Sequence, residues 1–267
     1  MISKLNNMLS VKVESLHKLA LVFVCITTLA GCYRPESAST IIQEYPEAKS
    51  NFSVGNNEFW VAGYSVQNRP ILVQTLGVGG ETVLLMATIH GNEPAGTPLL
   101  RKLSDYLQQW PSLLNGRRVV LINVANPDGW FANTRGNANG VDLNRNFTTT
   151  NRINSNLNGN HGLSEPEAVV LKNIILRYRP QRIISIHQPL ECIDYDGPGE
   201  NLAQKMARQC PLPVKKLGAR PGSLGSYAGV TLRIPIITFE MKKSDTRLSD
   251  SQLWSIYGRA LLAGIEG

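Results

Sequence analysis

Short apolar runs alternate with longer amphipathic stretches from residue 59 onward, and this alternation constrains the fold more than any other feature of the chain. The predicted strands span residues 71–76, 82–89, 118–124, 182–186 and 234–239. The predicted helices span residues 94–109, 165–178, 200–209 and 249–263. Because strands and helices alternate, we expect a single-domain α/β fold. Its sheet should be mixed, largely parallel and twisted, with helices on both faces.

The size and charge of the chain suit one globular domain with a mildly basic surface. At 267 residues and 42% hydrophobic content, the chain can bury a sizeable core. The formal net charge is +7, and the 27 lysines and arginines are scattered along the sequence. This distribution fits a solvated surface or small acidic substrates better than a nucleic-acid surface. We therefore expect no nucleic-acid partner.

The N-terminus resembles a bacterial lipoprotein signal. Three lysines precede an apolar run at 19–29, which is too short for a permanent membrane-spanning helix and suits the core of a secretory signal. The run closes with Leu29-Ala30-Gly31-Cys32, which resembles the lipobox whose cysteine receives lipid. We expect a signal peptide over 1–31, lipidation at Cys32, a tether over 32–57 and the folded domain over 58–267.

A lipid anchor would attach the protein to the periplasmic face of the outer membrane, and Tyr33 after the cysteine favours that sorting. A soluble periplasmic or cytoplasmic protein is the alternative. In an oxidising compartment, Cys192 and Cys210 can either form a disulfide or remain two separate thiols, and the sequence leaves both states open.

His90 and Glu93 follow the second predicted strand, directly before a predicted helix. Open α/β sheets build their sites at the carboxyl ends of strands. An imidazole and a carboxylate within one turn can both reach a single zinc ion. His187 ends the fourth predicted strand in the same way, so it is the best candidate for a third ligand. His161 lies in a polar loop, which predicts a surface position.

Glu240 and two arginines complete the candidate site. Glu240 ends the last predicted strand, where it can serve as a general base and acid; a solvent-facing edge residue is the alternative. Arg135 and Arg145 lie in the stretch 133–147, which is too rich in Asn and Arg for a core element. One guanidinium would stabilise an oxyanion and the other would clamp a substrate carboxylate. An ordinary surface loop is the alternative.

Three further stretches predict local structure. Ser164-Glu165-Pro166-Glu167 predicts a capping box, with the Glu167 carboxylate accepting the Ser164 N–H. Asn126-Pro127-Asp128-Gly129 predicts a turn that shapes the site. The polar stretch 148–162 predicts a long surface loop.

Five motifs occur in the order and approximate spacing of the M14-type zinc carboxypeptidases, which the chain resembles over most of residues 60–265. They are His90-x-x-Glu93, Asn126-Pro127-Asp128-Gly129, Val141-Asp142-Leu143-Asn144-Arg145-Asn146-Phe147, Ser185-Ile186-His187 and Thr238-Phe239-Glu240. Within this family the stretches 162–167, 187–194 and 221–227 are most similar to the murein peptide amidases. The resemblance implies a zinc carboxypeptidase-like catalytic domain over 58–267.

The resemblance also implies a role for each matching residue. One zinc ion would be bound by His90, Glu93 and His187. Glu240 would be the general base and acid, and Arg135 would polarise the scissile carbonyl and hold its oxyanion. Asn144 and Arg145 would bind the substrate carboxylate, and Asp142 would orient a zinc-bound histidine.

Two positions depart from the digestive members of the family. Asn92 stands between His90 and Glu93 where those enzymes carry an arginine. Their mobile tyrosine corresponds to a position near Leu217, so no catalytic role passes to Tyr227, which predicts packing or a pocket wall.

The implied function is a zinc-dependent murein peptide amidase that hydrolyses the γ-D-glutamyl-meso-diaminopimelate bond through a zinc-activated water. Such a hydrolase would act on peptidoglycan of the cell wall in the periplasm. The alternatives are a zinc carboxypeptidase for other peptides, a deacylase similar to aspartoacylases and succinylglutamate desuccinylases, and a cell-wall-binding lipoprotein with an inactive site.

Overall fold

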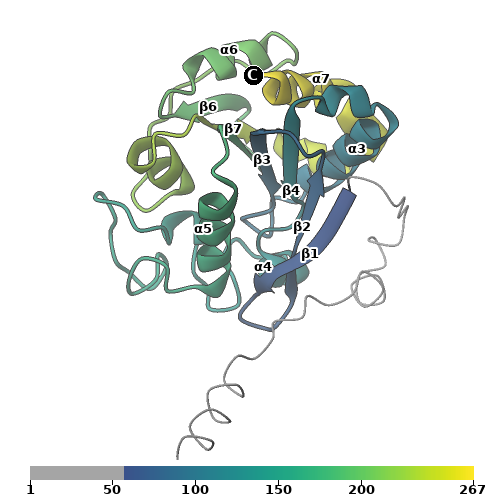
Figure 1. Cartoon of the computed structure of the whole chain (residues 1–267). Helices are drawn as coiled ribbons and strands as arrows, with labels where there is room; N and C mark the ends of the chain where they lie inside the picture. Colours follow the sequence, from purple (N-terminus) through teal and green to yellow (C-terminus); the bar gives the residue numbers. More distant parts are fainter. Residues whose placement is uncertain (1–56) are drawn as a thin grey trace, which may run out of the picture. The chain divides into compact units, whose positions relative to one another are not determined.

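A seven-stranded mixed sheet forms the centre of the protein, whose computed structural model describes residues 57–267 (Figure 1). In spatial order the strands are β1 (Asn57–Tyr64), β2 (Pro70–Leu76), β4 (Arg117–Ile122), β3 (Glu81–Ala87), β5 (Arg182–His187), β7 (Ile236–Glu240) and β6 (Cys192–Asp196). The predicted signal peptide, the lipidation at Cys32 and the tether before residue 57 lie outside the described residues. Within the described part, no helix has the length and apolar character needed to cross a membrane.

The sheet is parallel in the middle and antiparallel at both sides. Strands β4, β3, β5 and β7 run parallel to one another, so their carboxyl ends lie along one edge. Strands β1, β2 and β6 run antiparallel to their neighbours. This arrangement confirms the predicted fold class and places the last residues of β3, β5 and β7 side by side.

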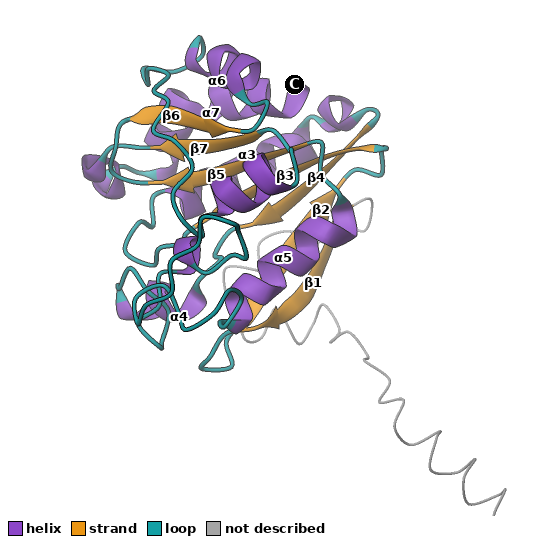
Figure 2. Cartoon of the chain, turned by 90° about the vertical axis from the view of Figure 1, so that its left-hand side faces the viewer, coloured by secondary structure: helices purple, strands orange, loops and turns teal. Residues whose placement is uncertain are grey.

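Helices cover both faces of the sheet because the central strands are apolar on both sides (Figure 2). In β3, Val83 and Leu85 belong to one core, whereas Leu84 and Met86 belong to the other. The first core also contains side chains of α3 (Gly96–Gln109), α6 (Glu200–Ala207) and α7 (Asp250–Glu266), and the second contains those of α5 (Pro166–Tyr178). Shorter helical segments are Pro111–Leu114, α4 (Pro127–Ala132), Leu143–Arg145, the π-helical Gly225–Thr231 and Lys243–Arg247.

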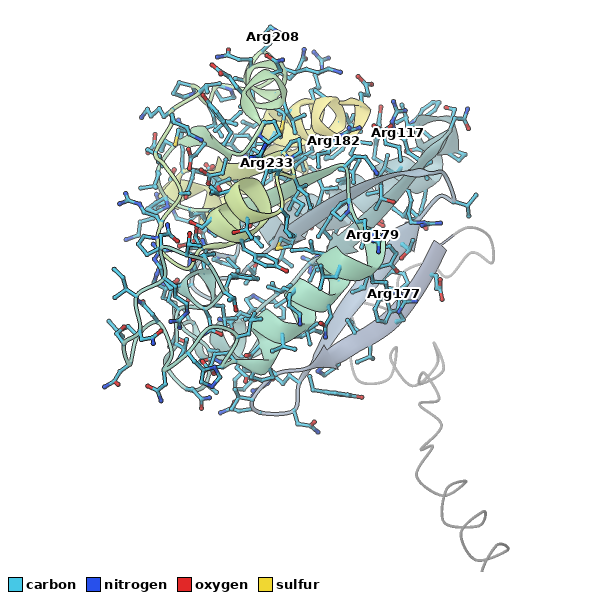
Figure 3. The ribbon with its side chains drawn as sticks, turned by 60° about the vertical axis from the view of Figure 1, so that its left-hand side comes forward. Arg117, Arg177, Arg179, Arg182, Arg208 and Arg233 are labelled. Carbon is cyan, nitrogen blue, oxygen red and sulfur yellow. The ribbon has the colours of Figure 1, made fainter. Side chains whose placement is uncertain are left out.

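At the amino-terminal ends of the parallel strands, Arg182 ties the end of α7 to the start of β5 (Figure 3). Its guanidinium donates to the carbonyls of Gly264 and Ile265 at 2.8 and 2.7 Å and pairs with Glu81 at 2.8 Å. A cation at a helix C-terminus also complements the helix dipole. This contact secures the end of the sheet that lies away from the candidate site.

The sequence did not predict strands β1 and β6. Strand β1 lies at one side of the sheet and mixes exposed, half-buried and buried residues, so it lacks a clear apolar run. Strand β6 lies at the other side and carries Asp194 and Asp196 among its five residues. In both cases the pairing with a neighbouring strand, rather than local apolar character, defines the element.

The predicted capping box is wrong. Because Pro166 occupies the first turn of α5, the N-cap is Glu165 rather than Ser164. The Glu167 carboxylate instead accepts from the Asn137 side-chain amide at 2.9 Å and from the Val66 N–H at 3.2 Å.

The predicted turn at 126–129 is the start of helix α4. The Asn126 side chain caps this helix by accepting the Gly129 N–H at 2.9 Å. The stretch 148–162 contains no helix or strand and includes the exposed His161, as predicted.

Candidate metal centre and substrate cavity

His90 and Glu93 lie on a tight turn between strand β3 and helix α3. The turn is closed by the Glu93 N–H, which donates to the His90 carbonyl at 3.1 Å. Gly91 allows the turn to pack against helix α4, because a Cβ atom there would lie 1.9 Å from the Gly129 carbonyl carbon. The short turn therefore directs both side chains to the same side.

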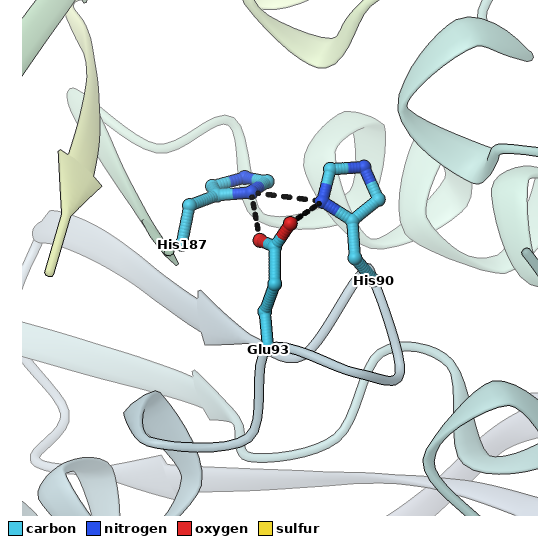
Figure 4. Close-up of side chains that lie close together, drawn as sticks. All are labelled: His90, Glu93 and His187. Carbon is cyan, nitrogen blue, oxygen red and sulfur yellow. Dashed lines mark hydrogen bonds and ion pairs between the residues drawn. The ribbon is translucent and has the colours of Figure 1, made fainter. Parts of the chain in front are cut away.

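His187 joins these two residues because β5 pairs in parallel with β3. The His90 Nδ1 lies 2.9 Å from one Glu93 oxygen, and the His187 Nδ1 lies 3.1 Å from the other (Figure 4). The two Nδ1 atoms are 3.3 Å apart. Zinc–nitrogen bonds of about 2.0–2.1 Å in a tetrahedron place two ligand atoms about 3.3 Å apart. The three side chains therefore fit one tetrahedral zinc ion.

Neighbouring groups hold the three side chains in this orientation. An Asp142 oxygen lies 3.1 Å from His90 Nε2, and the Ser185 hydroxyl lies 3.0 Å from His187 Nε2. The Gln188 N–H donates to Glu93 at 3.1 Å. With each Nε2 engaged, both histidines direct Nδ1 to the shared centre. A hydrogen bond at the second ring nitrogen is usual for metal-bound histidines.

Ser185 and Gln188 lie in stretches that carry the family resemblance, but neither was predicted to support the metal ligands. Ser185 could have been found, since it lies two residues before His187 and therefore on the same face of β5.

The charges at this centre depend on one another. Burial alone would raise the pKa of Glu93, but contacts with His187 and His90 hold it well below its ordinary value. Burial alone would lower the pKa of His90, but Asp142 and Glu93 raise it above its ordinary value. Glu93 is therefore ionised at neutral pH and can act as a ligand.

Glu240 lies directly across from His187 in the β5–β7 pair. Its side chain is buried, and one carboxylate oxygen accepts the Leu190 N–H at 3.2 Å. Burial raises the pKa of Glu240 above its ordinary value. A carboxylate with a raised pKa is suited to accepting and returning a proton.

Arg135 lies beside the metal ligands. Its guanidinium donates to Glu93 at 3.0 Å and to Asp142 at 3.0 Å, and its side chain is 46% exposed. Asp142 thus connects His90 with Arg135.

Arg145 lies deeper than Arg135, and its neighbour Asn144 is fixed by the backbone. Asn144 accepts the Leu224 N–H at 2.8 Å, and its own N–H donates to Asp142 at 2.9 Å. Burial lowers the pKa of Arg145; the Asp142 charge opposes this, and the nearby charges of Arg135 and Arg220 lower the pKa further. A partly buried guanidinium with cationic neighbours favours an anionic ligand.

These side chains surround one cavity of about 500 Å³. The predicted residues that line it are His90, Glu93, Arg135, Asn144, Arg145, His187 and Glu240. Asp142 lies behind this lining. The cavity also has polar walls that the sequence reasoning did not identify, formed by Gln188, Asp194, Asp196, Arg220, Ser223 and Thr238.

The other residues singled out in the sequence are Tyr227, Leu217, Asn92, Cys192 and Cys210. Tyr227 is buried and stacks on Phe147, with 5.5 Å between ring centroids, so it packs in the core. Leu217 lines the cavity, and Asn92 is exposed. Cys192 and Cys210 are both free thiols.

Comparison with known proteins gives consistent matches. The sequence profile of the zinc carboxypeptidase family matches residues 56–197. Murein peptide amidase A of Escherichia coli strain K12 is 37% identical over 179 residues, covering 60% of this chain and 71% of the relative. The Vibrio campbellii protein of the same name is 32% identical over 198 residues, covering 67% and 77%.

Two solved structures share the fold. Murein-tripeptide amidase MpaA from Escherichia coli O157 matches with a TM-score of 0.64 at 29% identity, covering 82% of this chain and 94% of that one. Carboxypeptidase A from Helicoverpa armigera matches with a TM-score of 0.65 at 20% identity, covering 86% and 72%.

Proposed function

Since this chain belongs to the zinc carboxypeptidase family and is therefore a hydrolase, we propose that it cleaves the γ-D-glutamyl-meso-diaminopimelate bond of murein peptides. The observation that carries the proposal is the single cavity that brings a zinc-compatible triad, a buried carboxylate and two guanidiniums together. The names of the relatives, murein peptide amidase A and murein-tripeptide amidase, support the choice of substrate.

His90, Glu93 and His187 would hold the zinc ion, which would supply a Lewis acid for the amide carbonyl and lower the pKa of a water molecule. Glu240 would accept the proton of the attacking water and return it to the leaving amine. Arg135 would donate to the carbonyl oxygen as negative charge develops there.

Arg145 and Asn144 would bind the free carboxylate of the leaving residue. A guanidinium binds a carboxylate through two parallel hydrogen bonds, which fixes the position of the bond to be cleaved. The scissile amide would then lie between this clamp and the metal centre, within reach of Glu240.

The test is incubation of the full-length protein with murein tripeptide. We expect release of meso-diaminopimelate, loss of this activity with a chelator and recovery with zinc. Glu240→Gln should retain zinc and lose turnover, whereas Glu200→Gln, which changes an exposed carboxylate at the start of α6, should keep both. An intact tripeptide after zinc loading would exclude the proposed substrate.

A substrate panel separates the proposal from its alternatives. Ordinary peptides with a free C-terminus would report a general carboxypeptidase, and N-acetylaspartate and succinylglutamate would report a deacylase. We expect the γ-D-glutamyl tripeptide to have the highest kcat/KM of the panel. Binding to peptidoglycan without zinc and without hydrolysis would instead favour an inactive wall-binding protein.

We further propose that the protein is a lipoprotein on the periplasmic face of the outer membrane. The proposal rests on the sequence around Leu29-Ala30-Gly31-Cys32, outside the described residues. Labelling with radioactive palmitate should mark the wild-type protein in the outer-membrane fraction, and Cys32→Ser should remove the label. An unlabelled protein in the soluble fraction would contradict it.

A further inference from the structure

Arginines gather at the end of the sheet that lies away from the cavity (Figure 3). Arg179 and Arg233 lie just before strands β5 and β7, and these strands are parallel, so both arginines lie at the amino ends of the strands. Arg177 lies in the last turn of α5, with its guanidinium 4.6 Å from the centre of the Trp60 ring in β1. We call the surface formed by Arg117, Arg177, Arg179, Arg182 and Arg233 the basic end.

The charge of the basic end is only partly balanced. Glu81 pairs with Arg117 at 3.2 Å and with Arg182 at 2.8 Å. Glu266, at the end of α7, pairs with Lys205 at 3.7 Å. The other three arginines of the basic end are exposed, and none of the ion pairs among residues 57–267 involves them. They outnumber the one further acid at this end, the exposed Glu58 at the start of β1.

Exposed apolar side chains lie beside these arginines. Val78, which is 71% exposed, lies between β2 and β3, next to Gly79, whose N–H donates to the Arg117 carbonyl at 3.0 Å. Trp110, which is 51% exposed, follows α3 shortly before β4 begins, and Leu176, which is 48% exposed, lies at the end of α5. Cations and exposed apolar side chains on one surface match the two layers of a lipid interface, the headgroups and the acyl boundary.

The chain enters the described domain at this same end. Asn57 pairs with Leu76, which pairs with Val119 in β4. Val119 pairs with Val83 in β3, and Val83 pairs with Arg182. These residues form one row across the sheet, and the metal centre lies at the other end of β5, roughly 17 Å away at about 3.3 Å per residue. An anchor upstream of residue 57 would therefore join the domain at the basic end.

We propose that the basic end binds the anionic phospholipid headgroups of a membrane surface, so that the substrate cavity faces away from the membrane. Guanidinium groups bind phosphate groups through paired hydrogen bonds, and each cation near an anionic lipid surface adds attraction. The exposed apolar side chains enter the interface beside them. The inference goes beyond the hydrolase function. It uses the proposed lipid anchor only for the side from which the chain arrives.

Vesicle co-sedimentation tests the proposal with full-length Cys32→Ser protein, which lacks the proposed lipidation site. It should bind vesicles of phosphatidylglycerol and phosphatidylcholine in equal parts at least about tenfold more tightly than vesicles of phosphatidylcholine alone, and high salt should reduce this preference. Arg179→Gly combined with Arg233→Gly should weaken binding to the anionic vesicles by roughly 25-fold, because each arginine contributes about fivefold. Both positions have a positive φ, 44° and 56°, so glycine fits there without strain and thermal stability should be retained.

The matched variant removes the same charge at the cavity end. Lys243→Gln combined with Arg247→Gln changes two exposed residues of the short helix that follows β7, and it should keep the binding to anionic vesicles. Equal losses in the two double variants, or equal binding of the parent protein to anionic and neutral vesicles, would overturn the proposal. Binding to purified peptidoglycan instead of vesicles, lost with Arg179→Gly and Arg233→Gly, would assign the surface to the cell wall and also overturn it.

Two further measurements separate this inference from the proposals above. The variant with Arg179→Gly and Arg233→Gly should hydrolyse murein tripeptide at the rate of its parent, because both residues lie away from the cavity. A wild-type protein without palmitate label, together with arginine-dependent vesicle binding, would refute the lipid anchor alone. A labelled wild-type protein whose Cys32→Ser variant has no preference for anionic vesicles would refute the role of the basic end alone.

Discussion

Substituting Asp142 with asparagine should weaken zinc binding without removing a zinc ligand. In the wild type, one Asp142 oxygen lies 3.1 Å from His90 Nε2 and also accepts the Asn144 N–H. The amide oxygen of asparagine can replace this oxygen with little change in shape. Its NH₂ group, however, would then face the Arg135 Nε, which donates to the second Asp142 oxygen at 3.0 Å.

The expected magnitude follows from the loss of charge at this hydrogen bond. A hydrogen bond to a charged group contributes about 1.5–3 kcal/mol, and one between neutral groups contributes about 0.5–1.5 kcal/mol. The midpoints of these ranges differ by roughly 1.25 kcal/mol, which corresponds to a loss in zinc affinity of nearly tenfold. This lies at the lower end of the 10- to 100-fold losses, roughly, that follow removal of such supporting groups. Turnover should also fall, because Arg135 loses one of its two anchors.

Competition with a chromophoric chelator measures the zinc affinity directly. By linkage, a tenfold weaker site also lowers the zinc-dependent stabilisation against unfolding by about 1.4 kcal/mol at saturating zinc. Asp128→Asn is the matched control, since Asp128 is a buried aspartate that accepts from Ser65 and Arg69 outside the cavity. It should lower stability without changing zinc affinity. Unchanged zinc affinity in folded Asp142→Asn would refute the view that Asp142 supports His90.

Three further outcomes follow from the structure. Arg145→Gln should lower kcat/KM by roughly 10- to 100-fold, because the charge-assisted clamp on the substrate carboxylate is lost. It should leave the hydrolysis of a substrate amidated at its terminal carboxylate unaffected. An equal loss on both substrates would argue against the clamp. Burial alone would raise the pKa of Glu165, but hydrogen bonds from the side chains of Asn137, Ser164 and Asn139 lower it below its ordinary value of 4.5. The ionised carboxylate therefore stabilises the fold above that pH, and this contribution is lost as the pH falls through the folded pKa. In thermal unfolding, Glu165→Gln should be less stable than wild type at pH 7, and the difference should shrink towards pH 3. Burial and the Glu240 charge raise the pKa of Cys192 to about 11, and burial also raises the pKa of Cys210. Because Cys192 is buried and Cys210 is only partly buried, at pH 8 iodoacetamide should modify Cys210 faster, as read by mass spectrometry; equal rates in the folded protein would contradict this.

Local sequence indicated most clearly the strands that are buried on both faces. Strands β3 and β5 are buried on both faces, so their apolar runs are continuous and their ends are well marked. The helix α5 was also predicted, but its cap was not, because Pro166 moved the helix start by one residue relative to the capping-box pattern. Glu167 then faces Asn137, 30 positions away along the chain, which no local pattern indicates.

The direction of each strand explains which cavity residues could be predicted. Strands β3, β5 and β7 are parallel, so polar residues after their apolar runs reach the same edge of the sheet, and His90, His187 and Glu240 follow this rule. Strand β6 runs the other way, and its first residue, Cys192, lies opposite Glu240. A carboxylate near the start of an antiparallel strand therefore reaches the same edge as the last residues of the parallel strands. Asp194 could only be placed in the cavity once the pairing of β6 with β7 was known, because the pattern of β6 alone does not state its direction.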